Sequence, residues 1–341
     1  LGYCGVACPT NAKQGALTTT IPGALDNNAR LFHGLRADKL VMEQNKISHL
    51  QASAMAADGV TPSGVTVELR ARHFVVAASA IGSPGLLLRS DIPDPYDRIG
   101  KRTFLHPVNA TIAEMPDTVD PYYGAPQSIY SDEFNFSQGV DGPAGFKLEV
   151  PPLHPAMSAG VVPGHGQEQK DNLGQLPWMH SVIALLRDGF HPDSVGGTVS
   201  LRDDGSPILD YPVSDYLWKG LKDAFYKMAE IQFAAGAQKV RIMHLDSPWY
   251  TSWADAKAGI DNLAMEPHRV RLFTAHQMGG CGMGRNPEES VVNGFGEHHH
   301  VANLSVHDAS IYPTSIGANP QLSVYALAAR NSTRLAQKLR S

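Results

Sequence analysis

The chain has 341 residues, of which 43% are hydrophobic, and this length and composition predict two folded domains rather than one. Lys and Arg number 28 against 33 Asp and Glu, and the net charge of −5 argues against a nucleic-acid-binding protein. No stretch approaches the ~18 consecutive apolar residues that a membrane-spanning helix needs. We therefore expect neither a nucleic-acid partner nor a membrane span.

Three cysteines, Cys4, Cys8 and Cys281, are too few for a disulfide framework. Reduced thiols are the simplest interpretation, and they favour a reducing compartment, so we predict a cytoplasmic location. Cys4 and Cys8 also have the C-x3-C-P spacing of a ferredoxin segment. Two cysteines alone cannot hold an iron–sulfur cluster, so that alternative needs ligands from another chain.

The first third of the chain predicts a helix followed by strands. Residues 11–28 contain helix formers and end at two asparagines, which predicts a helix. Residues 30–42 alternate in short runs, as two strands would, and residues 65–69 alternate strictly between apolar and polar types. These segments together predict a small antiparallel meander.

A strand–turn–helix unit follows the predicted meander. Residues 73–78 form a short, β-branched, apolar run that is typical of a buried parallel strand. Ser83 and Pro84 then provide an N-cap and a first-turn proline for a helix over residues 85–89. This order of elements is typical of an α/β domain.

The middle of the chain has a different character, with many Pro, Gly and Asp residues between positions 105 and 210. Residues 196–201 and 208–211 flank a turn and predict an antiparallel hairpin. Apolar residues at helical spacing predict a helix over residues 214–235, which ends at Gly236. We expect a second domain built on an antiparallel sheet.

The end of the chain returns to α/β character. Residues 303–306 predict a short strand, a loop follows, and Asn319 and Pro320 open a final helix that runs to about residue 339. No G-x-G-x-x-G, P-loop or H-E-x-x-H motif occurs. If a dinucleotide binds, its phosphate cradle is expected to come from elsewhere.

Three positions could carry chemistry. His276 precedes a glycine-rich turn, which lets backbone approach a planar ligand closely. Asn319 lies at a helix start, where free N–H groups favour an anion, and Asp308 ends a strand, where α/β proteins contact ligands. From spacing alone a turn histidine, an N-cap and a turn cap are the simpler explanations of the three.

Three adjacent histidines, at positions 298–300, invite a metal site. Adjacent side chains cannot easily share one face, so we interpret the run as a solvated turn and predict no metal site.

Five ordered segments of the chain are similar to motifs of one family. The chain resembles the glucose–methanol–choline (GMC) flavoprotein oxidoreductases. Residues 8–13 are similar to the family's C-x-x-G-A-K segment, residues 29–41 to its adenine-side strand pair, and residues 75–90 to its second signature. Residues 276–284 resemble its H-x-x-G-x-x-x-M-G segment, and residues 303–323 resemble its closing segment, which begins N-L-x-V-x-D-A-S. Three positions depart from the family pattern, because Asn11, Ser79 and Asp91 stand where the family usually has glycine.

The resemblance implies a mixed α/β fold, with a partial Rossmann-like FAD-binding domain and a substrate domain whose antiparallel sheet is flanked by helices. On this basis residues 1–105 and 266–341 are expected to belong to the FAD-binding domain, and residues 106–265 to the substrate domain. The family's N-terminal third carries G-x-G-x-x-G, which this sequence lacks. A further segment or a separate chain is therefore expected to supply it.

The resemblance also implies the chemistry. His276 matches the family's catalytic histidine, which would take the proton of an alcohol while hydride moves to flavin N5, and Asn319 matches its partner. The cofactor-binding residues implied are Ala37 at the adenine, Asp308 and Ala309 at the ribityl chain or pyrophosphate, and Asn319, Pro320 and Gln321 at the flavin ring.

Two other functions stay open. One is a lyase on the same scaffold, which would use His276 as acid and base without net redox chemistry. The other is a non-catalytic fragment or binding module, because the phosphate cradle is missing. The expected partners are a small-molecule alcohol and the segment carrying G-x-G-x-x-G.

Overall fold

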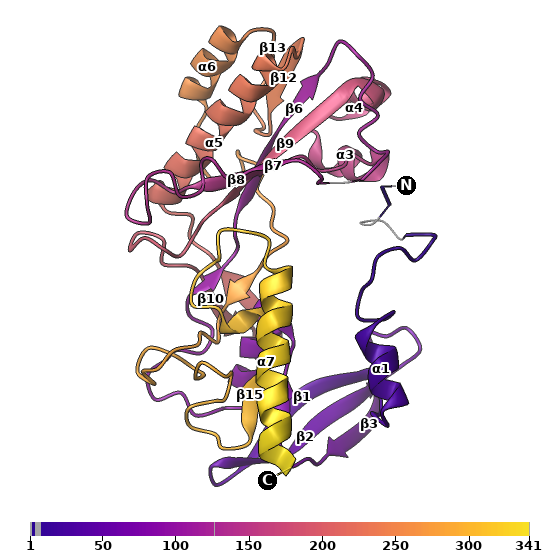
Figure 1. Ribbon diagram of the computed structural model, residues 1–341, viewed down its shortest axis with the longest axis vertical. Helices are drawn as coiled ribbons and strands as arrows, with labels where there is room; N and C mark the ends of the chain where they lie inside the picture. Colours follow the sequence, from indigo (N-terminus) through magenta and orange to yellow (C-terminus); the bar gives the residue numbers. More distant parts are fainter. Residues whose placement is uncertain (1, 4–7, 126, 341) are drawn as a thin grey trace. The chain divides into compact units, whose positions relative to one another are not determined.

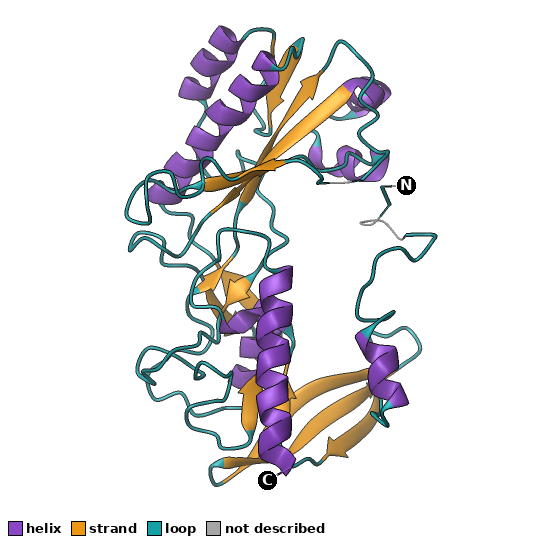
Figure 2. Cartoon of the chain, viewed as in Figure 1, coloured by secondary structure: helices purple, strands orange, loops and turns teal. Residues whose placement is uncertain are grey.

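The computed structural model describes residues 2–3, 8–125 and 127–340. The chain forms two compact units (Figures 1 and 2), here called unit 1 (Leu1–Arg30, Pro107–Arg187 and Ser214–Thr274) and unit 2 (Leu31–His106, Asp188–Val213 and Ala275–Ser341). Residues 1–30 thus group with the middle of the chain, and residues 188–213 group with the ends. The functional assignment of domains expected from the sequence stays a prediction.

Unit 1 is built on a six-stranded antiparallel sheet with the strand order β13-β12-β6-β9-β8-β7. This sheet confirms the antiparallel architecture that the middle of the sequence predicts. The strands are β6 (Val108–Glu114), β7 (Tyr130–Ser131), β8 (Phe146–Glu149), β9 (Met179–Leu186), β12 (Lys239–Ile242) and β13 (Trp249–Tyr250).

Helices pack on both faces of this sheet (Figure 1). The amide of Asn109 on β6 donates to the carbonyl of Leu221 on α5 (Asp215–Ala234) at 2.9 Å, while Val108 and Ile112 pack against Val162 after α3. Alternate side chains of β6 therefore point to opposite faces of the sheet. The other helices of unit 1 are α1 (Thr20–Asp26), α3 (Pro155–Val161), α4 (Gly166–Gly174), η1 (Leu176–Trp178) and α6 (Trp253–Asn262).

Unit 2 contains a parallel pair of strands, β4 (Phe74–Val76) and β15 (Leu304–Val306), which the sequence predicts at both places. Phe74 and Val76 of β4 and Leu304 and Val306 of β15 belong to one core with Leu87 and Ile311. The chain continues from β4 into α2 (Ser79–Arg89) and from β15 into η2 (Ala309–Ile311). This arrangement is the part of a Rossmann-like fold that the chain supplies.

A three-stranded antiparallel sheet, β1-β2-β3, completes the meander of unit 2. Its strands are β1 (Leu35–Glu43), β2 (Lys46–Met55) and β3 (Pro62–Leu69). The prediction of two strands within residues 30–42 is wrong, because β1 is one strand. Register shifts between Ala37 and Lys39 and between Val41 and Met42 interrupt its alternation, which explains the broken pattern in the sequence.

The predicted start of α2 at Ser83 and Pro84 is also wrong, because the helix begins at Ser79. The hydroxyl of Ser83 instead accepts from the amide of Ala78 at 2.9 Å and donates to a carboxylate oxygen of Asp308 at 2.5 Å. Ser83 therefore joins the start of α2 to the end of β15 rather than capping a helix.

Other predicted elements are confirmed, with different bounds. The hairpin is β10 (Thr198–Leu201) with β11 (Pro207–Asp210), and the final helix is α7 (Gln321–Arg340). The helix predicted over residues 11–28 is only α1, because Gly15, Thr18 and Thr19, all poor helix formers, precede it. In the part of the chain that is described, none of the helices combines the length and apolarity that a bilayer crossing requires.

The three positions that depart from the family's glycines share one backbone conformation. Asn11, Ser79 and Asp91 have φ angles of 53°, 68° and 52°, in the left-handed region. Glycine enters this region without steric strain, whereas other L-residues do so at a cost that is lowest for Asn and Asp. These three positions thus have the backbone conformation that glycine adopts most readily.

Candidate active site

His276 lies in unit 2, two residues before β14 (Met278–Gly279), and its imidazole is half-buried. Its Nδ1 lies 3.1 Å from Nδ1 of His106, and the two ring centroids are 5.2 Å apart. Burial lowers the pKa of His276 below its usual value, because the charged imidazolium loses hydration. The ring is therefore neutral at neutral pH, the state that a general base requires.

Strand pairing places His106 beside His276. In the antiparallel pair of β14 with β5 (Thr103–Phe104), Met278 faces Phe104 and Gly279 faces Thr103. Continuing this register by two residues sets His106 opposite His276. The two histidines, 170 residues apart in sequence, therefore meet because of one short backbone ladder.

Asp188 holds the backbone that carries His106. Its buried carboxylate accepts the amide N–H of Leu105 at 3.2 Å and that of His106 at 3.2 and 3.3 Å, and the hydroxyl of Tyr211 donates to it at 2.7 Å. Burial raises the pKa of Asp188, although the donors from Tyr211 and His106 act in the opposite direction. The carbonyl of Asp188 accepts from Ser315 at 2.8 Å, in the loop that leads to Asn319.

The glycines after His276 approach the chain's own backbone. Gly279 and Gly280 have φ angles of 83° and 93°. A Cβ on Gly279 would lie 2.0 Å from the carbonyl oxygen of Arg102, and a Cβ on Gly280 would lie 2.9 Å from Oγ1 of Thr103. These two glycines are required for the close pairing of β14 with β5. From the sequence alone, we expect them to let the backbone approach a planar ligand.

Asn319 is solvent-exposed and precedes Pro320 and α7. The carbonyl of Pro320 accepts from the amide of Val324 at 2.9 Å, so helical hydrogen bonding begins here. The first turn of α7 contains no acidic residue, and its Leu322 is 80% exposed. A helix N-terminus whose first turn carries no acidic side chain fits a ring that carries negative charge.

The other predicted cofactor contacts are partly engaged within the chain. The carboxylate of Asp308 accepts from the amides of Ser79 at 2.9 Å and Ser310 at 2.7 Å, in addition to the hydroxyl of Ser83. The carbonyl of Ala37 accepts from Arg89 at 3.3 Å. Donors of the chain itself therefore engage the Asp308 carboxylate and the Ala37 carbonyl.

The interpretation of residues 298–300 as a solvated turn is wrong for His298, which is only 6% exposed. Its Nδ1 accepts the amide N–H of His300 at 3.2 Å, and His299 Nε2 lies 2.9 Å from the hydroxyl of Ser290. Among the described residues no group of three or more potential ligands is arranged to hold a metal ion.

Two of the three cysteines are described, and Cys4 lies outside the described residues. Cys8 and Cys281 are free thiols. Hydrogen bonds from Thr10 and the amide of Ala12 lower the pKa of the partly exposed Cys8 to about 7, whereas burial raises the pKa of Cys281. Cys281 is therefore an inert core residue.

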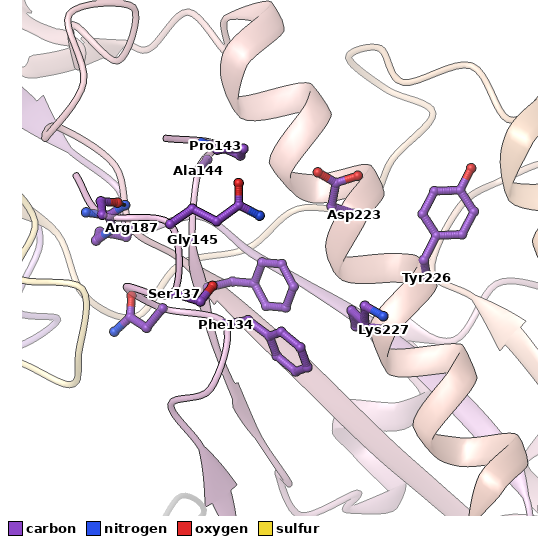
Figure 3. A pocket seen from close by; sticks show the side chains of 13 residues that line it. Phe134, Ser137, Pro143, Ala144, Gly145, Arg187, Asp223, Tyr226 and Lys227 are labelled. Carbon is purple, nitrogen blue, oxygen red and sulfur yellow. Dashed lines mark hydrogen bonds between the residues drawn. The ribbon is translucent and has the colours of Figure 1, made fainter. Parts of the chain in front are cut away.

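A cavity of about 200 Å³ lies within unit 1 (Figure 3). The buried Arg187 after β9 lines one part of it, and Asp223, Tyr226 and Lys227 of α5 line another. Phe134 contributes an aromatic wall. None of the site residues predicted from the sequence lines this cavity.

The sequence comparisons agree with the fold and with the motif order. Two family models described as GMC oxidoreductase match the chain, an N-terminal one over residues 1–108 and a C-terminal one over residues 192–328. The geometry described above, with a partial Rossmann-like unit and a unit on an antiparallel sheet, defines a flavoprotein-type fold. The chain belongs to the GMC oxidoreductase family.

Among its curated relatives is the long-chain-alcohol oxidase FAO1 of Arabidopsis thaliana, which is 26% identical over 99% of this chain and 46% of that protein. The chain spans about half the length of the curated relatives it matches.

Solved structures share the fold. Pyridoxine 4-oxidase from Mesorbium loti superposes with a TM-score of 0.64 at 19% identity, over 94% of this chain and 60% of that one. A formate oxidase from Aspergillus oryzae, studied for the modification of its FAD, gives a TM-score of 0.65 at 15% identity, over 89% of this chain and 60% of that one.

Proposed function

We propose that the chain belongs to an FAD-dependent enzyme that oxidises the CH–OH group of a small-molecule alcohol. The observation that carries this proposal is the half-buried, neutral His276, which Nδ1 of His106 contacts at 3.1 Å. Membership of the GMC oxidoreductase family supports the reaction class, and the name of the relative FAO1 supports alcohols as substrates.

In the proposed reaction His276 accepts the hydroxyl proton of the alcohol. Since Nδ1 is engaged by His106, the accepting atom is Nε2. The carbon-bound hydrogen leaves with its electron pair as the carbonyl forms, so that the alcohol loses two electrons and two hydrogens. FAD, when bound, supplies the acceptor for that hydrogen and electron pair.

Asn319 positions the substrate in this proposal. Its amide donates to the hydroxyl oxygen as that oxygen gains negative charge. Its own place is set by Pro320 and the start of α7. The first-turn amides, beginning at Gln321, stabilise negative charge on the cofactor's pyrimidine side.

The chain holds FAD by main-chain groups at Ala37, Asp308 and Ala309 and by Asn319, Pro320 and Gln321. A phosphate cradle of the G-x-G-x-x-G type does not occur in the sequence. We therefore propose that a further segment, in the same polypeptide or in another, completes the site.

The reduced thiol chemistry expected of Cys281 is consistent with the proposed cytoplasmic location.

The test uses the complete FAD-containing enzyme under anaerobic conditions. Mixing with a series of primary alcohols of increasing chain length should bleach the oxidised flavin band and yield one carbonyl product per reduced flavin. Cleavage of a hydroxylated substrate with the flavin left oxidised would instead establish the lyase alternative. Neither reduction nor cleavage, in a sample that retains FAD, would favour the binding module.

Asn319 has its own test, because a helix start can also be purely structural. In Asn319→Ala the rate of flavin reduction should fall at least ~10-fold if the amide holds the reacting oxygen. A loss of ~1 kcal/mol in the free energy of unfolding with an unchanged rate would show that Asn319 serves only as a cap.

A further inference from the structure

We propose that His106 is a positioning residue that fixes the tautomer of His276, by accepting a hydrogen bond from Nδ1–H of His276 on its own Nδ1. This assignment rests on the proposed function, and it adds a residue that the sequence motifs do not indicate. Its consequence is that the lone pair of the neutral His276 ring resides on Nε2, the atom that faces the chemistry in the proposed reaction.

The contact between the two Nδ1 atoms allows only one proton between them. At 3.1 Å one nitrogen must donate and the other must accept, and a neutral imidazole carries a single N–H. If His106 donated, His276 would carry its proton on Nε2 and could not accept another there. If His276 donates, Nε2 is the acceptor, so only this arrangement permits a general base at His276.

The same arrangement survives proton transfer. When Nε2 of His276 gains a proton, its Nδ1–H becomes a stronger donor, and the contact with His106 is strengthened rather than broken. A neutral partner stabilises the imidazolium less than a carboxylate would. The pKa of His276 therefore stays below its usual value, as its burial already dictates, and the ring is ready to accept a proton at neutral pH.

The protein holds His106 by its backbone. The ring is fully buried, and φ of His106 is 50°, a left-handed conformation that costs about 1 kcal/mol for a residue with a Cβ. Asp188 stabilises this conformation by accepting the amides of Leu105 and His106, and Tyr211 donates to the same carboxylate. The carboxyl group of Asp188 thus contacts the backbone of His106, and the ring of His106 contacts His276.

This conformation selects the variants that test the inference. Asparagine tolerates a left-handed φ, and its carbonyl oxygen can accept where Nδ1 of histidine accepts. Glycine tolerates the same φ but offers no acceptor. His106→Asn and His106→Gly therefore differ in the acceptor while both relieve the backbone strain.

The kinetic test measures anaerobic flavin reduction in the complete FAD-containing enzyme. His106→Gly should reduce the limiting rate by about 10- to 100-fold with little change in the apparent Kd of the alcohol, and His106→Asn should recover most of that loss. FAD content and urea unfolding of both variants are the controls for a structural defect. Equal rates in His106→Gly and the wild type would overturn the inference and leave the proposed function standing.

A spectroscopic test is independent of turnover. With 15N-labelled histidine, the wild-type enzyme should show His276 as the Nδ1–H tautomer, and His106→Gly should shift it toward the Nε2–H tautomer. A wild-type His276 that carries its proton on Nε2 would refute the inference. If no alcohol reduces the flavin, the proposed function fails, and the nitrogen shifts still decide the role of His106.

Discussion

The buried His298 makes the stability of unit 2 depend on pH in a window that can be calculated. Its ring is 6% exposed, and Nδ1 accepts the amide N–H of His300 at 3.2 Å. Burial, together with the charges of His300 and His299, lowers its pKa from 6.5 to about 4. Protonation of Nδ1 in the folded state would both charge a buried ring and destroy the hydrogen bond from His300.

The direction of this pH dependence follows from proton binding to His298 in the folded and unfolded states. Between pH 4 and 6.5 the unfolded chain binds more protons at His298 than the folded chain, so the free energy of unfolding rises with pH. The contribution is fully present above pH 6.5 and is lost as the pH falls toward 4. The fall in the pKa of His298 corresponds to a contribution of about 3 kcal/mol to the free energy of unfolding. About 2 kcal/mol of this contribution is lost between pH 7 and pH 5.

Urea unfolding at pH 7 and pH 5 measures this contribution. In His298→Asn the side-chain oxygen replaces the acceptor without titrating, so the loss of stability from pH 7 to pH 5 should be about 2 kcal/mol smaller than in the wild type. His33→Asn, at a solvent-exposed histidine of the same unit, is the matched control and should keep the wild-type loss. Equal losses in His298→Asn and the wild type would refute the calculation.

Substitutions at three further positions test the local structure by urea unfolding. Ser79→Gly should raise the free energy of unfolding by about 0.5–1 kcal/mol, because it relieves an exposed left-handed residue, whereas Ser79→Ala should give no gain. Tyr211→Phe should lower it by about 2 kcal/mol through the lost hydrogen bond to Asp188, and a loss below ~0.5 kcal/mol would contradict that role. Gly279→Ala should lower it by about 3 kcal/mol or more, because its Cβ would clash with the carbonyl of Arg102, and near-wild-type stability would show that this close approach is dispensable.

Elements with strong local signals could be predicted from the sequence. Helix α5 follows from apolar residues at helical spacing and a left-handed Gly236, whose φ is 94°. The hairpin β10–β11 follows from its turn residues, and the parallel strand β4 follows from its β-branched, apolar run. In each case local propensity and tertiary packing favour the same structure.

Features that depend on distant contacts could not be predicted. The start of α2 was misplaced because Ser83 bonds to Asp308, 225 residues away, instead of capping a helix. The burial of His298 depends on its place in the folded chain, which a run of three histidines does not reveal. The contact of His106 with His276 cannot be predicted, because a single histidine before a proline matches no motif. The two rings meet only because β5 pairs with β14.

The central claim is that His276 accepts the proton of the alcohol, and single-turnover flavin reduction tests it most directly. In the complete enzyme, saturating alcohol is mixed anaerobically with the wild type and with His276→Asn, each with its FAD content measured. The rate constant for flavin reduction should fall by ~100-fold or more in the variant, with FAD still bound. A rate constant within a few-fold of the wild type would show that another group removes the proton.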